Sequence, residues 1–327
     1  MYAWGGSTSG WKKPGNYGFD SARKPYLDRL AADASARGPR AYTRRNEPNM
    51  KLVDPRGKEI TSDSKNPLVV AVDVTGSMAE WPGEIFDRLP LLYQTLSQYR
   101  DDLEICFAAI GDANCDEWPL QVNDFGKGLD LEEKLKALGC EGRGGGQISE
   151  TYELFAYFMQ EKCKTPNATS PFLLIFGDEK FYPEVNPGQV EHYIGDKLQA
   201  PAESKQVWQN LMQRFNLFFL HKPYGEGRDK ATDREVKNYW AETIGGQRII
   251  ELPNKERAVD VAMGLIAKQW GQYSDFADNL SARQDSKDAN TVHGSLRFID
   301  GKPSVKSVVL SEALTRTRTR PLDKMGT

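Results

Sequence analysis

Short apolar runs alternate with longer amphipathic stretches along most of this chain, and that alternation limits the fold more than any other feature. Runs with the length and composition of buried parallel strands lie at 68–72, 103–110, 172–176, 216–220 and 248–252. The amphipathic stretches predict helices at 84–99, 149–162, 190–198, 205–214, 233–243 and 256–270. Strands that alternate with helices form a mainly parallel sheet with helices on both faces. We therefore expect a three-layer α/β protein.

Local signals refine two of these helices and add two elements. Pro90 lies within 84–99 and predicts either a kink or a later start of that helix. Ser149 precedes the apolar face of 149–162 and is a candidate N-cap. Between the second and third strands we expect a short edge strand and a further helix, at 120–125 and 131–138.

The two ends of the chain differ in composition from its middle. Residues 1–66 contain 13 Lys and Arg against 7 Asp and Glu, a net charge of +6, whereas the remainder has 30 against 39, or −9. We expect a basic, glycine- and aromatic-rich extension over 1–66, an α/β domain over 67–273 and a C-terminal part over 274–327. The extension either packs loosely on the domain, orders on a partner, or contacts nucleic acid through its arginine and aromatic residues.

The C-terminal part carries weaker signals. Residues 274–291 are polar and predict a linker. The pair Asp300-Gly301 predicts the turn of a hairpin between strands at 296–299 and 305–310. The remaining residues are expected to form a solvated tail.

Composition also bears on where the protein works. No apolar run approaches the roughly 20 residues that a membrane helix needs, and MYAWGGSTSGWKK lacks the apolar stretch of a secretion signal. We expect a cytoplasmic protein with no membrane partner. The four cysteines include no CxxC pair and the chain has three histidines, so neither a disulfide framework nor a zinc site is indicated.

Oxygen-bearing side chains follow the first predicted strand directly. Asp73, Thr75 and Ser77 alternate in VVAVDVTGSM, and Asp178 ends another strand in FLLIFGDE. Ligands bind at the carboxyl ends of parallel strands, so these side chains are expected at one edge of the sheet. One carboxylate and two hydroxyls suit a hard cation such as Mg²⁺. Alternatively, Thr75 and Ser77 cap a helix and Asp178 caps a turn.

These residues resemble the metal-ion-dependent adhesion site of von Willebrand factor A domains. DVTGSM is similar to the D-x-T/S-x-S signature of that family, and GGGQISE and Asp178 follow it in the family's order; GGGQISETYEL resembles bacterial members. The resemblance covers about residues 67–270 and implies a Rossmann-like fold with Mg²⁺ or Mn²⁺ bound. Gln147 stands where many members have Thr, so the second loop would supply the Gln147 amide oxygen, the Ser149 hydroxyl or a water.

The resemblance implies a binding function. In this family a carboxylate of a partner protein completes the coordination of the metal, and intracellular bacterial relatives often work with AAA+ ATPases of the MoxR type. We therefore expect a protein-binding or assembly module of the bacterial or phage intracellular type, with no catalytic residue. Glu150 and Glu179 neighbour the predicted site and would tune its charge, contact the partner or remain ordinary solvated carboxylates.

Two other functions stay open. DVTGS also resembles the phosphorylation motif of haloacid-dehalogenase-like phosphotransferases, which would make Asp73 the nucleophile of a Mg²⁺-dependent phosphohydrolase, with Asp112 and Asp116 as acidic magnesium ligands. A structural or nucleic-acid-associated role would rest on the basic extension. Other catalytic motifs, including G-x-S-x-G and HExxH, are missing from the sequence, and His192, His221 and His293 have no context that indicates a base.

Overall fold

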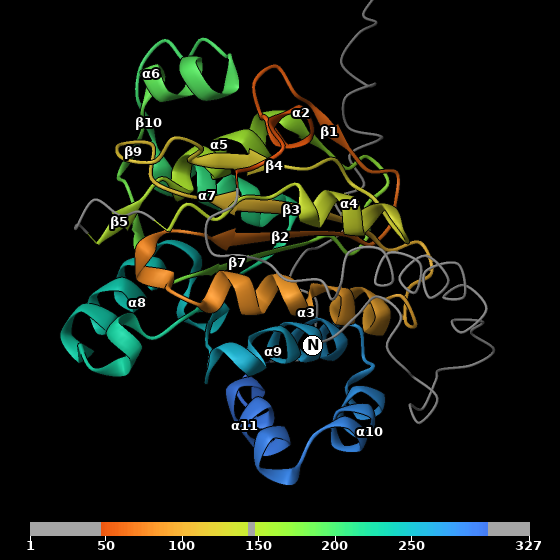
Figure 1. Cartoon of the computed structure of the whole chain (residues 1–327). Coiled ribbons are helices and arrows are strands. Elements are labelled where there is room, and N and C mark those ends of the chain that lie inside the picture. Colours follow the sequence, from red (N-terminus) through yellow and green to blue (C-terminus); the bar gives the residue numbers. More distant parts are fainter. Residues whose placement is uncertain (1–46, 143–147, 300–327) are drawn as a thin grey trace, which may run out of the picture.

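The computed structural model describes residues 47–142 and 148–299, and a six-stranded sheet lies at its centre (Figure 1). The strand order is β12-β11-β7-β2-β3-β4. The bounds are β2 Pro67–Asp73, β3 Glu104–Ile110, β4 Leu120–Val122, β7 Phe172–Gly177, β11 Asn216–His221 and β12 Ile249–Glu251. All neighbours pair in parallel except β3 and β4, which are antiparallel at one edge. The predicted α/β class and mainly parallel sheet are confirmed.

Helices cover both faces of the sheet, because alternate side chains of the central strands enter two different cores. Val70 and Val72 of β2 belong to one buried cluster, and Val69 and Ala71 belong to the other. The first core contains α3 Trp81–Leu96, α4 Asp130–Lys136, α9 Ala258–Gln269, α10 Tyr273–Arg283 and α11 Ser286–Leu296. The second contains α5 Tyr152–Lys162, α7 Ser204–Arg214 and α8 Lys230–Ile244. The predicted three layers are therefore present, with α3 and α9 on one side of the sheet and α5 and α7 on the other (Figure 1).

Short elements complete the described part of the chain. Three two-stranded pairs join β1 Ile60–Thr61 to β6 Cys163–Lys164, β5 Ser149–Glu150 to β8 Lys180–Phe181, and β9 Glu184–Val185 to β10 Ala202–Glu203. The short helices are α2 Met50–Val53, η1 Gly76–Met78, α6 Pro187–Gln189, η2 Val190–Ile194, η3 Tyr224–Gly227, η4 Gly246–Arg248 and η5 Lys255–Arg257.

Three predictions about helices are wrong in detail. Helix α3 begins before residue 84 and continues through Pro90, so Pro90 does not delay its start. Ser149 does not cap α5, because it lies in β5 and the helix begins at Tyr152. The helix predicted at 190–198 ends at Ile194, since Gly195 adopts φ +85°, a left-handed conformation that glycine tolerates and that stops a helix.

The polar linker predicted at 274–291 is also wrong. Helices α10 and α11 fill this region, and Phe276, Leu280, Val292 and Leu296 join the first core. The Asp285 side chain caps α11 by accepting a hydrogen bond from the Asp288 N–H at 2.8 Å. Sparse apolar residues at helical spacing are enough here because α9 offers a buried surface to receive them.

The terminal predictions can be followed only in part. The first strand of the predicted hairpin is wrong, because Leu296 ends α11 and no strand follows within the described residues up to 299. Its second strand at 305–310 and the tail lie outside the described residues. Residues 1–46 of the predicted extension also lie outside them, whereas Val53 and Ile60 are fully buried in the two cores.

None of the helices in the described ranges combines the length and the apolar character that crossing a bilayer requires.

Replacing Gly264 of α9 with alanine should destabilise the protein by about 1–3 kcal/mol through overpacking. A Cβ at this position would lie 2.5 Å from Leu296 Cδ1 and 2.7 Å from Phe276 Cε1. Urea unfolding of Gly264→Ala measures the effect. Gly294→Ala on α11 is the matched control, because a Cβ there meets nothing within 4 Å and should stabilise slightly through helix propensity. Equal stability of the two variants would contradict the packing of α10 and α11 on α9.

Candidate metal centre

The first loop of the candidate centre is organised by Asp73, the last residue of β2. Its Oδ1 atom accepts hydrogen bonds from the Thr75 N–H at 2.8 Å and the Thr75 hydroxyl at 2.6 Å, which folds the chain into a tight turn. The Thr75 and Ser77 hydroxyl oxygens lie 3.2 Å apart. The three predicted oxygen-bearing residues of this loop therefore converge.

The loop after β7 meets the first loop, because β2 and β7 are neighbours in the sheet. The Ser77 hydroxyl donates to Asp178 Oδ1 at 2.8 Å, which joins residues 101 positions apart in the sequence. Both Asp73 and Asp178 are fully buried. The structure thus brings together Asp73, Thr75, Ser77 and Asp178, as the sequence predicts.

A buried lysine, Lys222, also joins the loops after β2 and β7, and the sequence did not predict it. Lys222 Nζ donates to Asp178 Oδ2 at 2.8 Å and to the Ser77 carbonyl oxygen at 3.0 Å. The Lys222 side chain is 2% exposed. Its place directly after the β11 strand, at the same edge of the sheet as Asp73 and Asp178, is the signal that could have found it.

Tyr152 is the first residue of α5, and its spacing in the sequence indicates only an apolar helix face. Its hydroxyl donates to Asp73 Oδ2, and the whole side chain is buried. The ring lies against the last residue of β7, since a Cβ on Gly177 would come within 2.3 Å of the tyrosine hydroxyl oxygen. Glycine at 177 is therefore what lets Tyr152 reach Asp73.

Glu150 and Glu179 are held beside this cluster by the pairing of β5 with β8. They are 2% and 3% exposed, and Trp240 Nε1 donates to the Glu179 carbonyl oxygen at 2.8 Å. Among the described residues, Oε2 of each glutamate has no hydrogen-bond partner. Side chains this deeply buried are not solvated carboxylates, and they leave almost no surface for a partner protein to touch.

Burial and mutual repulsion raise the pKa of Asp73, Glu150 and Glu179. Burial is the largest cause of the raised pKa of Asp73, followed by the charge of Asp178. Burial likewise raises the pKa of Glu150 and of Glu179, and in both cases the charge of Asp73 is the next cause. Burial also raises the pKa of the Tyr152 hydroxyl, which therefore acts as a donor to Asp73. A positive ion would relieve the repulsion.

The second-loop residues give a mixed outcome. Gln147 lies outside the described residues. Ser149 is half-buried and pairs with Lys180 in the β5–β8 ladder. Because successive side chains of a strand point in opposite directions, Ser149 faces away from the side on which Glu150 approaches Asp73. Among the described residues, the Ser149 hydroxyl makes no hydrogen bond to Asp73, Ser77 or Asp178.

The donor set fits a hard divalent cation by its chemistry. It consists of oxygen atoms alone, from the carboxylates of Asp73, Asp178, Glu150 and Glu179 and the hydroxyls of Thr75 and Ser77. Among the described residues, Oε2 of Glu150 and Oε2 of Glu179 have no hydrogen-bond partner and are therefore free to bind a cation. Within the described ranges, no group of three or more His, Cys, Asp or Glu side chains is arranged to hold a metal.

The geometry gives little support to Asp73 as a phosphorylated nucleophile. Asp73 is fully buried, and both of its carboxylate oxygens already accept hydrogen bonds. The proposed acidic magnesium pair forms a local turn instead, in which Asp116 Oδ2 accepts from the Asp112 N–H at 2.7 Å. A nucleophile needs an exposed lone pair, and Asp73 presents none to solvent.

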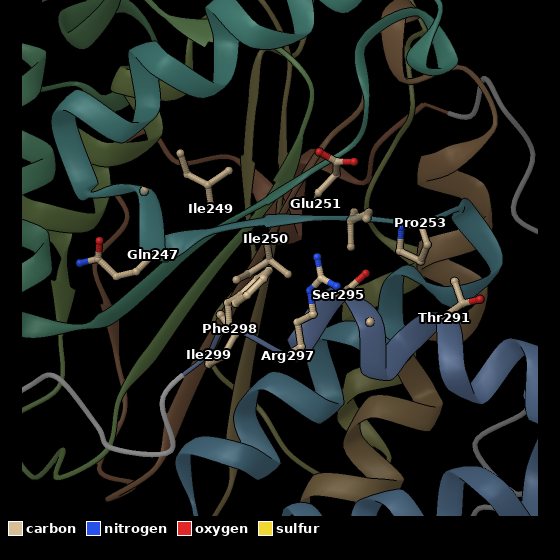
Figure 2. Close-up of a pocket in the computed structure, with 13 residues that line it drawn as sticks. Gln247, Ile249, Ile250, Glu251, Pro253, Thr291, Ser295, Arg297, Phe298 and Ile299 are labelled. Atoms are coloured by element: carbon tan, nitrogen blue, oxygen red, sulfur yellow. The ribbon is translucent and has the colours of Figure 1, made fainter.

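Two of the cavities lie outside this cluster. One of about 580 Å³ is bordered by β12 and the end of α11, including Ile250, Glu251 and Arg297 (Figure 2). Its single acid, Glu251, is already paired with Lys237 at 2.8 Å. A second cavity of about 480 Å³ is lined by residues 79–81, directly after the first loop, and by residues 253–256. Only the second adjoins the candidate centre along the chain.

Comparison with known proteins identifies no family. No protein-family model matches the chain, and no curated protein matches it. Among solved structures, the pilus adhesin SpaC from Lactobacillus rhamnosus GG has a TM-score of 0.46 and 10% identity over 66% of this chain and 32% of the adhesin. Proximal thread matrix protein 1 from the mussel byssus has a TM-score of 0.44 and 11% identity over 65% of this chain and 49% of that protein. The chain therefore spans about a third to a half of these proteins.

Proposed function

We propose that this protein is a binding module that recognises another protein through a divalent cation, Mg²⁺ or Mn²⁺. The observation that carries the proposal is the convergence of Asp73, Thr75, Ser77 and Asp178, four residues in the order that von Willebrand factor A domains use for their metal site. Glu150 and Glu179 add buried acid to the same place. Such a cluster of oxygens favours a hard cation.

The partner would approach from the first loop. Gly76 and Ala79 are exposed and Ser77 is half-buried, whereas the acids behind them are buried. A carboxylate from the partner would be repelled by these acids unless a cation stood between them. Binding that depends on the cation follows from this charge arrangement, and the cavity beside residues 79–81 offers room for the partner's neighbouring side chains.

The resemblance to von Willebrand factor A domains implies a partner protein that supplies a carboxylate. We propose a cytoplasmic protein that presents an acidic side chain, with an AAA+ ATPase of the MoxR type as one such partner. Capture of partners by the full chain from the native cell, with Mg²⁺ and then with EDTA, tests this part. A partner released by EDTA and absent with Ser77→Ala supports it; capture unaffected by both changes contradicts it.

Cation binding by itself is expected to stabilise the protein. At a free Mg²⁺ concentration about 100 times its Kd, the free energy of unfolding should rise by about 2.7 kcal/mol. For a chain of 327 residues, that gain corresponds to an increase in Tm of about 4–5 °C. Ser77→Ala should lose most of this increase, because it removes the hydroxyl between the two loops. Ser274→Ala, on the exposed face of α10, is the matched control and should keep it.

A Tm unchanged by millimolar Mg²⁺ and by millimolar Mn²⁺ would refute the cation site and with it the proposed function.

A further inference from the structure

The four buried acids of the centre are not equivalent, because only one of them has a cationic partner. Among the described residues, Lys222 is the only lysine or arginine that contacts any of Asp73, Glu150, Asp178 or Glu179, and it contacts Asp178. Lys180, the nearest lysine in sequence to Glu179, pairs instead with Glu235 at 2.6 Å. Within the described part of the chain, Asp178 is therefore paired with a cationic side chain, and Asp73, Glu150 and Glu179 are not.

Lys222 also keeps a cation away from Asp178. The Lys222 ammonium group donates to the Asp178 carboxylate and to the Ser77 carbonyl oxygen. The backbone N–H of Lys222 donates to the Gly177 carbonyl oxygen at 2.9 Å. A divalent ion on Asp178 would stand within a few ångströms of this buried ammonium, where like charges repel strongly. Asp178 is better suited to hold the two loops together than to bind a metal.

Glu150 and Glu179 have the opposite character. Each is more than nine-tenths buried and has an Oε2 atom with no hydrogen-bond partner among the described residues, and the pairing of β5 with β8 places them on adjacent segments. Hydrogen bonding by Glu150 and by the Ser77 hydroxyl opposes the rise in the pKa of Glu179, so both groups lie close to its carboxyl. Two carboxyl groups placed side by side in this way either share a proton or bridge a cation. The second arrangement would satisfy both orphaned oxygens.

We infer that Glu150 and Glu179, with the Ser77 hydroxyl, hold the divalent cation, and that Asp178 paired with Lys222 is a positioning residue. The inference rests on the proposed function and changes its ligand set. Two carboxylates and a hydroxyl leave positions in an octahedral shell for waters and for one partner carboxylate, which would reach the cation beside the half-buried Ser77 rather than beside the buried glutamates.

Mn²⁺ binding to the full chain tests the inference, because electron paramagnetic resonance measures the concentration of free Mn²⁺ directly. We expect wild type to bind Mn²⁺, and Glu150→Gln and Glu179→Gln each to weaken binding by at least about tenfold. Glu153→Gln is the matched control. Glu153 is also a buried glutamate, but it accepts from the Tyr182 N–H at 2.9 Å, and its substitution should leave Mn²⁺ affinity unchanged.

Stability gives a second readout that does not depend on affinity. In EDTA, Glu150→Gln and Glu179→Gln should melt at or above the wild-type Tm, because each removes a repelling acid; with Mn²⁺, wild type should gain stability and the variants should not. Mn²⁺ bound by wild type and by both variants with equal affinity would overturn the inference alone. No Mn²⁺ bound by wild type would overturn the proposed function as well. Variants that melt far below wild type in EDTA would contradict the repulsion on which the ligand assignment depends.

Discussion

Lys222→Met is expected to lower the free energy of unfolding by about 3–5 kcal/mol, the typical cost of removing one partner from a buried ion pair. Asp178 is fully buried, and Lys222 Nζ lies 2.8 Å from its Oδ2 atom. Methionine has a similar length but no charge, so the Asp178 carboxylate would lose its only cationic partner among the described residues. The Ser77 carbonyl oxygen would lose a donor at 3.0 Å in the same step.

Chemical denaturation in EDTA measures this loss without interference from a bound ion. Lys205→Met is the matched control, because Lys205 pairs with Glu242 at 3.3 Å on the surface, where ion pairs contribute about 0–1 kcal/mol. The double variant Lys222→Met/Asp178→Asn should recover part of the lost stability, since it also removes the unpaired carboxylate. A Lys222→Met protein as stable as the control would show that the buried pair does not hold the two loops together.

The strands and the first loop could be predicted because their signals are local. Asp73, Thr75 and Ser77 lie within five positions of one another directly after an apolar run, so the turn and its oxygens follow from adjacent residues. Asp178 follows another apolar run, and the general rule for parallel sheets places it at the same edge. No knowledge of distant contacts is needed for either step.

The burial of the second acid pair could not be predicted, since it depends on contacts between distant short segments. Strands β5 and β8 have two residues each, too short for a periodic signal, yet their pairing places Glu150 beside Glu179. The place of Lys222 after an apolar strand is visible in the sequence, but its contact with Asp178 depends on β11 lying next to β7, a strand order that the sequence leaves open. The contact between the Tyr152 hydroxyl and Asp73 could not be predicted either, because helical spacing shows only which face of α5 is buried.

The C-terminal helices were missed for a different reason. Their sequence is mostly polar, and the few apolar positions, among them Phe276 and Leu296, are widely spaced. Composition alone favoured a linker. The helices are stabilised instead by packing on α9, where the lack of a side chain at Gly264 allows close approach.

Trp240→Ala should destabilise the protein by about 3–5 kcal/mol, the range for a buried tryptophan truncated in a core. Trp240 of α8 is fully buried and stacks on Phe219 with ring centroids 4.3 Å apart. It also meets Phe181 edge-on at 4.9 Å and Tyr152 at 5.7 Å. These contacts connect the second core to the tyrosine that donates to Asp73, so the cavity left by alanine would lie directly beneath the candidate centre.

Trp240→Phe separates the packing of this residue from its hydrogen bond. The smaller ring keeps much of the apolar contact but removes the Nε1–H that donates to the Glu179 carbonyl oxygen at 2.8 Å, a loss of about 1–3 kcal/mol for a buried acceptor left unpaired. Phe298→Ala is the control, because Phe298 is 78% exposed and its truncation should change stability by less than about 0.5 kcal/mol. Trp240→Phe should also weaken Mn²⁺ binding, since Glu179 would be held less firmly. If Trp240→Phe changes neither the stability nor the Mn²⁺ affinity, the candidate centre does not depend on the aromatic core.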